Sequence, residues 1–426
     1  MRRSTDTYVL EALVAGIERE LPRAVALRHR LHAHPELAHA ERGTAAAVAA
    51  ELPVAARSVA GTGLLATVGP SLADRPSPSE RPSPTERPSS TDGPSPTTRP
   101  VAVRAELDAL PIRERTGARF ASRGEAMHAC GHDVHMAALV ALTRSAQALG
   151  EELPAPLLAV FQPSEEAYPS GAQMLAQGGL GSPTPAAIVA AHVHPEQGWG
   201  TVALDGGTIN ASCDYVEMVV RGESSHGAYP HRGRDAILAL AQVIVALHAQ
   251  VGRRFDPLHP VVLTVGTVSG GEAENVLPAA ARAGAALRAH RPEDRRALRA
   301  LVEEVVGGVA AAHGCSGEVQ LTPGEPALEN DAAIVAWAHE MLPAADLARA
   351  PEWRSYGSDD MAFLGAVAPL AMGFVGLAGA PGFAVRPLHH PELLPPDEAV
   401  AAVARAQAVL YVAAASAYGA PAMAAA

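Results

Sequence analysis

The segment from residue 127 to residue 135, MHACGHDVH, concentrates side chains that can bind a metal ion. It contains His128, Cys130, His132, Asp133 and His135. Neutral imidazole, thiolate and carboxylate are the protein groups that bind borderline divalent metals. The alternative is an ordinary loop cysteine among solvent-exposed histidines, which would be the better interpretation of an isolated Cys-x-His pair. Because further clusters of acids and histidines recur along the chain, the metal-binding interpretation is favoured.

The residues that follow predict how this segment is positioned. The run MAALVALTRSAQAL has apolar residues at helical spacing and therefore predicts an α-helix. Asp133 would be the N-cap of this helix. The turn formed by Cys130, Gly131 and His132 would then lie at the positive end of the helix dipole, where a thiolate is stabilised.

Three apolar segments predict buried strands that end in polar residues: 101 to 112, 154 to 166 and 186 to 195. The polar residues at their ends are Glu106 and Asp108, Glu165 and Glu166, and His192 and His194. Continuous apolar strands separated by helices predict a parallel sheet with covered faces, and ligands of such sheets bind beyond the carboxyl ends of the strands. Each pair alone could be solvated strand-end polarity, but together they indicate a metal site at this edge.

Two other regions carry histidines. The segment RHRLHAHPELAHAERGT, residues 28 to 44, contains His32, His34 and His39, which we interpret as exposed residues at a helix end rather than as ligands. The segment LHHPELLPPDEAV, residues 388 to 400, places His389 and His390 on a predicted loop before the last helix.

The composition limits the class of protein. At 426 residues the chain is expected to form two domains. Its net charge of −12 argues against nucleic acid as a partner, and we find no run of about 18 apolar residues that would predict a membrane span. Three widely separated cysteines argue against a disulfide framework. Three glutamates within the first 20 residues argue against a signal peptide, so we expect a cytoplasmic protein.

Residues 71 to 100 and 213 to 323 differ from the rest of the chain. The first segment repeats RPSPSE, RPSPTE and RPSSTD, has few apolar residues and predicts a disordered surface insertion, with a PxxP-type docking motif as a less favoured alternative. The second predicts the order βαββαβ of a ferredoxin-like domain. The predicted buried faces of its two helices are Ile237, Leu240, Ile244, Leu247 and Val251, and Leu298, Leu301, Val302, Val305 and Val309. Residues 1 to 212 and 324 to 426 would form the catalytic metal-binding domain, an α/β fold with a mostly parallel sheet.

Several of these segments together resemble one known family. The chain resembles the aminoacylase and hippurate-hydrolase branch of the dinuclear-metal peptidases, which includes N-acyl-amino-acid amidohydrolases and auxin-conjugate hydrolases. The resemblance is carried, in order, by RHRLHAHPEL, RAELDALP, MHACGHDVH, FQPSEE, HVHP, GESSHGAYPH, GGEAENVLP, GSDDMAF and LHHPELLPPDEA. It spans most of the chain, and the order and number of the motifs make it specific.

The resemblance implies a role for individual residues. The implied ligands of two divalent metal ions are Cys130, His132, Glu166, His192 and His389, with Cys130 shared. Manganese or zinc is expected, with cobalt or nickel as alternatives. Glu165 matches the general base, and Asp108 matches an acid that orients a ligand. The residues of the inserted domain that match substrate-contacting positions, often in the partner subunit's site, are His226, Asn275 and Arg288. This implies a homodimer formed through the inserted domain.

Two positions depart from the family pattern. Glu106 stands where the family usually has aspartate, and Asp359 stands where it usually has glutamate. Both changes keep the charge and alter the side chain by one methylene, so they leave the chemistry plausible and bear on substrate preference.

The adjacent acids Glu165 and Glu166 fit the implied hydrolysis. Successive side chains of an extended backbone point in opposite directions, but a turn after Pro163 and Ser164 would let one acid bind metal while the other accepts a proton. A metal pair about 3.5–4 Å apart lowers the pKa of a bridging water and polarises the scissile carbonyl. Arg288 could hold a carboxylate in a two-pronged contact, with a surface ion pair as the alternative.

We therefore predict a metal-dependent amidohydrolase that cleaves N-acyl amino acids or similar small conjugates to a carboxylic acid and an amine. A metallo-dipeptidase or carboxypeptidase is the alternative enzyme. A catalytically silent metal-binding protein, docked through residues 71 to 100, is the alternative from another class, and the presence of Glu165 and all five ligand candidates argues against it.

The insertion gives the first testable prediction. Replacing residues 71 to 100 by a short Gly/Ser turn should leave the melting temperature and the turnover number close to those of the parent, because this segment has too few apolar residues to contribute to a core. Thermal unfolding and steady-state kinetics of the two proteins check this. A large fall in either quantity would show that the segment is structural.

Overall fold

The computed structural model describes residues 2–70 and 99–418, which divide into two compact units. Unit 1 comprises Met1–Gly206, Asn330–Trp353 and Phe363–Ala426, and unit 2 comprises Gly207–Glu329 and Arg354–Ala362. Unit 2 extends beyond the predicted insert, 213 to 323, on both sides and takes in a separate later segment. The predicted disordered insertion lies outside the described residues except for its last two positions.

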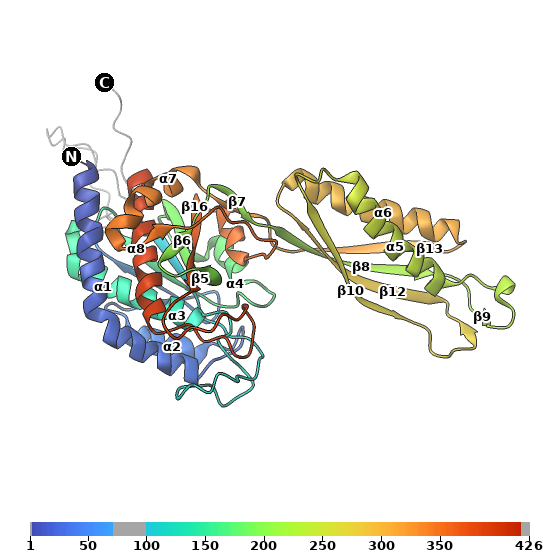
Figure 1. Cartoon of the computed structure of the whole chain (residues 1–426), viewed down its shortest axis with the longest axis horizontal. Coiled ribbons are helices and arrows are strands. Elements are labelled where there is room, and N and C mark those ends of the chain that lie inside the picture. Colours follow the sequence, from blue (N-terminus) through green and yellow to red (C-terminus); the bar gives the residue numbers. More distant parts are fainter. Residues whose placement is uncertain (1, 71–98, 419–426) are drawn as a thin grey trace, which may run out of the picture. The chain divides into compact units, whose positions relative to one another are not determined.

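Unit 1 is built on an eight-stranded sheet with a parallel centre (Figure 1). In spatial order its strands are β1 (Arg57–Val59), β2 (Gly63–Val68), β4 (Leu157–Gln162), β3 (Val101–Glu106), β5 (Ala187–Gly198), β16 (Leu370–Ala378), β6 (Thr201–Ala203) and β15 (Ala348–Arg349). β4, β3, β5 and β16 run parallel, whereas β2 pairs antiparallel with β4 and β6 with β16. Strands β3 and β4 are buried throughout, as the continuous apolar runs predict.

Helices pack against this sheet and against one another. They are α1 (Arg2–Ala33), α2 (Arg42–Glu51), α3 (His132–Leu149), the short α4 (Gly171–Met174), α7 (Ala332–Met341) and α8 (Glu398–Tyr418). α3 contacts α1, α8 and β3, so most of its residues are buried, including the continuous apolar run from Met136 to Leu142. The predicted α/β fold with a parallel sheet covered by helices is confirmed.

Unit 2 contains the predicted βαββαβ order. Its antiparallel sheet has the strand order β10 (Val261–Gly270), β12 (Ala280–Ala289), β8 (Ser212–Arg221) and β13 (Ser316–Pro323), and its helices are α5 (Ala236–Arg254) and α6 (Pro292–Ala312). Two smaller sheets pair β9 (Ser225–His226) with β11 (Val276–Leu277), and β7 (Gly207–Asn210) with β14 (Leu328–Asn330). The ferredoxin-like prediction for the insert is confirmed.

The predicted buried face of α5 is partly wrong. Ile237 is 45% exposed, and the buried residues of this helix are Ala236, Ala239, Leu240, Val243 and Leu247. The core side of α5 therefore uses small alanines, which a search for large apolar residues does not weigh. In α6 the predicted residues are buried except Val309, which is half-buried.

Two described helices are long and apolar enough to cross a membrane by length and composition alone. They are α5 and α8, with 28% and 89% of the apolar window buried, respectively. α8 is a core helix of unit 1, which accounts for its apolar composition.

The predicted N-cap of α3 is wrong. The helix begins at His132, and Gly131 precedes it in the left-handed conformation with φ of +85°. A Cβ atom at Gly131 would lie 2.5 Å from Val193 Cγ2, so the turn needs glycine for space as well as for φ. Asp133 lies inside the first helical turn, and its carboxylate binds Arg28 and His32 instead of capping the backbone.

Candidate metal centre

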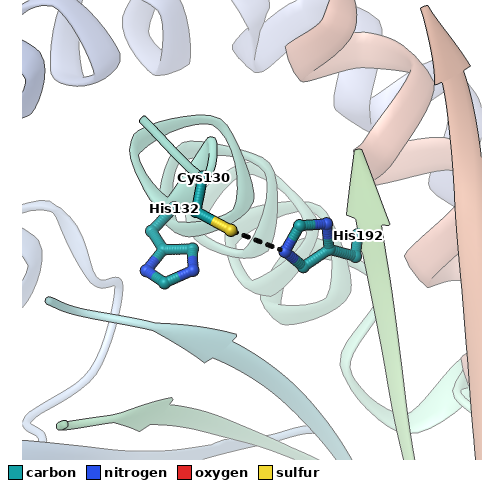
Figure 2. Close-up of side chains that lie close together, drawn as sticks. All are labelled: Cys130, His132 and His192. Carbon is teal, nitrogen blue, oxygen red and sulfur yellow. Dashed lines mark hydrogen bonds between the residues drawn. The ribbon is translucent and has the colours of Figure 1, made fainter. Parts of the chain in front are cut away.

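The carboxyl ends of the parallel strands and the start of α3 bring the predicted ligands of unit 1 together. Cys130 and His132 lie at the amino end of α3, His192 lies on β5, and Glu166 follows β4. His389 lies on the loop between β16 and α8, and its backbone N–H donates to the carbonyl of Ala129, 2.8 Å away. Figure 2 shows the side chains of Cys130, His132 and His192 turned toward one another, with 3.5 Å between the Cys130 Sγ and His192 Nε2 atoms.

Among the described residues, two of the five groups of three potential ligand atoms contain Cys130. Cys130, His132 and His192 form one group, and Cys130, Glu166 and His389 form the other, with the atoms of each group within 4.8 Å of one another. In the second group His389 Nε2 lies 3.2 Å from Glu166 Oε1. The sulfur of Cys130 is common to both groups. The geometry therefore provides two neighbouring metal-binding positions that share one ligand.

The hydrogen bonds of the two buried histidines prepare them to bind metal. His132 Nδ1 donates to the carbonyl of Asp108 at 2.8 Å, and His192 Nδ1 donates to the carbonyl of Val193 at 2.7 Å. A carbonyl only accepts, so both rings carry the proton on Nδ1 and present the lone pair of Nε2. His132 Nε2 is buried and has no hydrogen-bond partner among the described residues. A set of thiolate, imidazole and carboxylate with such a free nitrogen fits a divalent metal.

The acids Glu165 and Glu166 lie on a turn directly after β4. Ser164 adopts a left-handed conformation with φ of +48°, as the need to bring both acids to one site requires. Glu165 Oε2 lies 3.8 Å from His132 Nε2, and both acids belong to a further group of possible ligands with His132. Asp108 supports this turn, because its Oδ2 atom accepts the backbone N–H of Glu166 at 2.9 Å. Asp108 therefore orients His132 through its carbonyl and the acid turn through its carboxylate.

The electrostatics of the cluster favour a bound cation. Burial raises the pKa of the Cys130 thiol well above its usual range, and the charges of Glu166 and Glu165 raise it further. Burial also raises the pKa of Asp108, by more than His132 lowers it. For His192, burial lowers the pKa well below its usual range and so keeps the ring neutral. A divalent cation stabilises thiolate and carboxylate and needs neutral imidazole, so it fits this arrangement.

His135, part of the same sequence segment, has a supporting place instead. Its Nδ1 lies 2.7 Å from Glu106 Oε2, and its Nε2 accepts the backbone N–H of Val193 at 3.0 Å. Glu106 also pairs with Arg104. Glu106, His132 and His135 form another possible group, but hydrogen bonds already use both ring nitrogens of His135. The glutamate at 106 thus reaches His135, which holds the backbone beside His192.

The predicted substrate-contacting residues lie in unit 2 and do not form one cluster there. His226 and Asn275 are exposed beside the β9–β11 pair, where the Gly227 N–H donates to the Asn275 carbonyl at 2.7 Å. Arg288 lies near the other end of β12 and donates to the carbonyl of Tyr356 at 2.7 Å. From Ala280 to Arg288 the strand covers about 26 Å at about 3.3 Å per residue.

The interpretation of the histidines in residues 28 to 44 was wrong for His32. His34 and His39 are exposed, but His32 is fully buried, with Nδ1 3.0 Å from Asp133 Oδ2 and Nε2 3.1 Å from Glu114 Oε1. Both nitrogens contact carboxylates, so His32 is not a ligand.

Arg28 is also fully buried. It donates to Asp133 at 3.1 Å and to Asp397 at 2.7 Å. Arg28 therefore connects the start of α3 to the segment that follows His389. The only sequence signal for this network was a density of basic residues near the end of a predicted helix.

Comparisons with known proteins agree with this geometry. Residues 102–411 match the model of peptidase family M20/M25/M40. A Synechocystis protein named a probable hydrolase is 33% identical over 390 residues, covering 89% of this chain and 92% of its own. The N-acetyl-L-cysteine deacetylase of Bacillus subtilis is 32% identical over 292 residues, covering 68% of each chain. The crystal structure of a B. subtilis dinuclear metal binding peptidase of the M20 family has a TM-score of 0.76 and 27% identity, covering 93% of this chain and 98% of its own.

The buried histidine His32 gives a prediction of pH-dependent stability. Burial lowers its pKa, but the charge and hydrogen bond of Asp133 and the contact with Glu114 outweigh burial and raise the pKa to about 9. The stabilisation is complete below the unfolded pKa of about 6.5 and is lost as the pH rises through about 9, with an upper value of about 3 kcal/mol. Unfolding free energies of the chelated protein from pH 6 to 10 measure it.

The variant His32→Gln should lose this dependence, so that its stability relative to the parent is lowest near pH 6 and recovers toward pH 10. His34→Gln, at an exposed position of the same segment, is the matched control and should follow the parent. Parallel curves for parent and His32→Gln would contradict a charged His32.

Proposed function

The chain belongs to peptidase family M20/M25/M40, and we propose that it hydrolyses N-acyl amino acids with two divalent metal ions held by unit 1. It is a metal-dependent amidohydrolase of such substrates or similar small conjugates, as its similarity to the deacetylases indicates. The observation that supports two ions is the pair of ligand groups that share the sulfur of Cys130. His132 and His192 would complete one position, and Glu166 and His389 the other.

Each residue of unit 1 then has a defined task. Bound divalent ions supply Lewis acidity, which polarises the scissile carbonyl and lowers the pKa of a water molecule. Glu165 accepts the proton of the attacking water and passes it to the leaving nitrogen. Glu166 would hold a metal ion rather than transfer a proton, because its backbone is held by Asp108 while its side chain lies beside Cys130 and His389. The buried hydrogen bonds of His132 and His192 keep both rings in the ligating tautomer.

The types of ligand atom limit the choice of metal, and the relatives indicate the class of substrate. The shared thiolate and three imidazoles suit zinc and the carboxylate suits manganese, with cobalt and nickel as alternatives. Two relatives favour a small acyl group in the substrate of this chain. They are the B. subtilis protein named N-acetyl-L-cysteine deacetylase and the Priestia megaterium protein named N-acetyldiaminopimelate deacetylase, which is 38% identical over 221 residues. Arg288 supplies a two-pronged donor for the α-carboxylate of the amino acid.

We also propose that unit 2 forms a homodimer. α5 exposes three large apolar side chains, Ile237, Leu238 and Val245, at 45%, 50% and 63%. β10 is an edge strand of the unit 2 sheet, so its backbone groups can pair with a second copy. His226 and Asn275 lie far along the sheet from Arg288, which supports a role of the two ends of unit 2 in different active sites.

The function is tested by separating the roles of the two adjacent acids. Glu165→Gln keeps the shape of the side chain and the metal ligands but removes the proton acceptor. Its turnover number on N-acetyl and N-benzoyl amino acids should fall by about 10²-fold or more, with KM and metal content close to the parent. Glu166→Gln should lower metal affinity as well, with partial recovery in excess metal.

Kinetics in manganese, zinc, cobalt and nickel, with metal analysis of each protein, measure both effects. Metal loss in Glu165→Gln rather than in Glu166→Gln would exchange the two assignments. An unchanged rate in both variants would remove the hydrolase mechanism.

The dimer proposal is tested by mixing two inactive chains. His226→Ala should impair turnover without changing metal content, since His226 is not among the ligand groups. If His226 acts in the partner's site, mixing this variant with Glu165→Gln should restore up to about a quarter of parental activity in an equal, freely exchanging mixture. Mixed dimers isolated through two different tags give the decisive measurement, because activity absent from them would place His226 in its own chain's site.

A further inference from the structure

We propose that Glu41, which lies outside both ligand groups, is a positioning residue that holds the Ser164–Glu166 turn in its catalytic conformation. Its side chain is fully buried, and it belongs to the segment before α2, far from the acids in the sequence. The proposal rests on the proposed function, because it assigns Glu41 a role through Glu165 and Glu166.

Both carboxylate oxygens of Glu41 accept hydrogen bonds. Oε1 accepts the backbone N–H of Ser164 at 2.8 Å, and Oε2 accepts the hydroxyl of Thr62 at 2.7 Å. These partners are neutral groups, and burying a carboxylate against neutral donors has a high cost in free energy. The hydrogen bonds that Glu41 accepts from Ser164 and Thr62 offset this cost and connect its side chain to the backbone of the acid turn.

The partner of Glu41 is the strained residue of the acid turn. Ser164 has φ of +48°, a left-handed conformation that is unfavourable for a residue with a Cβ atom. An extended residue at this position would continue the direction of β4, whereas the positive φ of Ser164 turns the chain directly before the two acids. The left-handed turn brings both acids within reach of His132. The hydrogen bond from Ser164 to Glu41 stabilises this conformation directly.

A second carboxylate holds the other end of the same turn. Asp108 accepts the N–H of Glu166, and Glu41 accepts the N–H of Ser164, so the residue between them, Glu165, is fixed from both sides. The Ser164 hydroxyl adds a bond to the carbonyl of Ala167 at 2.9 Å. Glu41 is itself anchored, because its carbonyl accepts the N–H of Ala45 in the first turn of α2.

The chain offers a matched control in Glu36. Its carboxylate also binds a backbone N–H near the start of α2, that of Thr44, at 2.7 Å, and the Thr44 hydroxyl at 2.9 Å. Glu36 supports the start of α2 through its carboxylate, whereas Glu41 supports it through its backbone carbonyl, and the Glu36 carboxylate does not contact the acid turn in these hydrogen bonds. Glu36→Ala and Glu41→Ala each remove a hydrogen-bonded carboxylate from the segment around the start of α2, and an effect on the acid turn is expected in Glu41→Ala alone.

The experiment compares Glu41→Ala, Glu41→Gln and Glu36→Ala in the full-length protein loaded with cobalt. Glu41→Ala should lower kcat by about 10- to 100-fold with a small change in KM, the range found for groups that orient metal-site residues. It should also change the visible spectrum of bound cobalt and weaken cobalt binding. Glu41→Gln keeps a neutral oxygen for Ser164 and should recover part of both quantities. Glu36→Ala should leave kcat and the spectrum unchanged.

A double substitution tests whether Glu41 acts through Ser164. Glycine adopts a positive φ without the Cβ penalty, so Ser164→Gly removes the strain that Glu41 offsets. Glu41→Ala should then lower kcat by a smaller factor in the Ser164→Gly background than in the parent. Equal factors in the two backgrounds, or an unchanged kcat and cobalt spectrum in Glu41→Ala, would overturn the proposal.

If Glu41→Ala does not fold, Glu41→Gln carries the same comparison against Glu36→Gln. Failure of the proposed function gives a different result: the parent would hydrolyse none of the N-acyl amino acids. The cobalt spectrum would still report whether Glu41 positions Glu166.

Discussion

The structure depends on holding a buried thiol and two half-buried carboxylates close together. Cys130, Glu165 and Glu166 converge within unit 1, where burial and their mutual repulsion raise the pKa of the Cys130 thiol. Burial and the nearby acids favour the protonated form of the Cys130 thiol, whereas burial raises the pKa of Glu166 by less than His389 and His132 lower it. A divalent cation reverses the preference of the thiol. Hydrogen bonds to the surrounding backbone and the contact between His389 and Glu166 hold the ligand side chains in place.

The supporting groups act on the backbone and on ring orientation. Carbonyls fix the tautomers of His132 and His192, and His135 holds the backbone N–H beside His192. Arg28 joins Asp133 at the start of α3 to the segment after His389. The ligands come from four separate parts of the chain, so each connection of this kind replaces a constraint that the local sequence could not supply.

The fold was predictable where the pattern is local. Buried strands appear as apolar runs, and the polar residues that follow two of them, Glu166 and His192, each lie close to Cys130 in the structure. Contacts between distant segments gave no such signal. His32 reaches Asp133, 101 positions away, and its interpretation as an exposed residue was wrong because nothing in its neighbours showed that it would be buried. The predicted buried face of α5 was partly wrong because alanine was not counted as a core residue.

Three residues around the centre adopt positive φ: Gly131, Ser164 and His389. Only one is glycine, so the other two carry a Cβ penalty that a sequence chosen for stability alone would avoid. In each case a backbone hydrogen bond joins the strained residue to another segment: Ser164 to Glu41, and His389 to Ala129. The positive φ values occur where the backbone must turn so that the neighbouring side chains point toward the site. The hydrogen bonds of Ser164 and His389 therefore stabilise the backbone at the points where the metal ligands and the base need an unfavourable conformation.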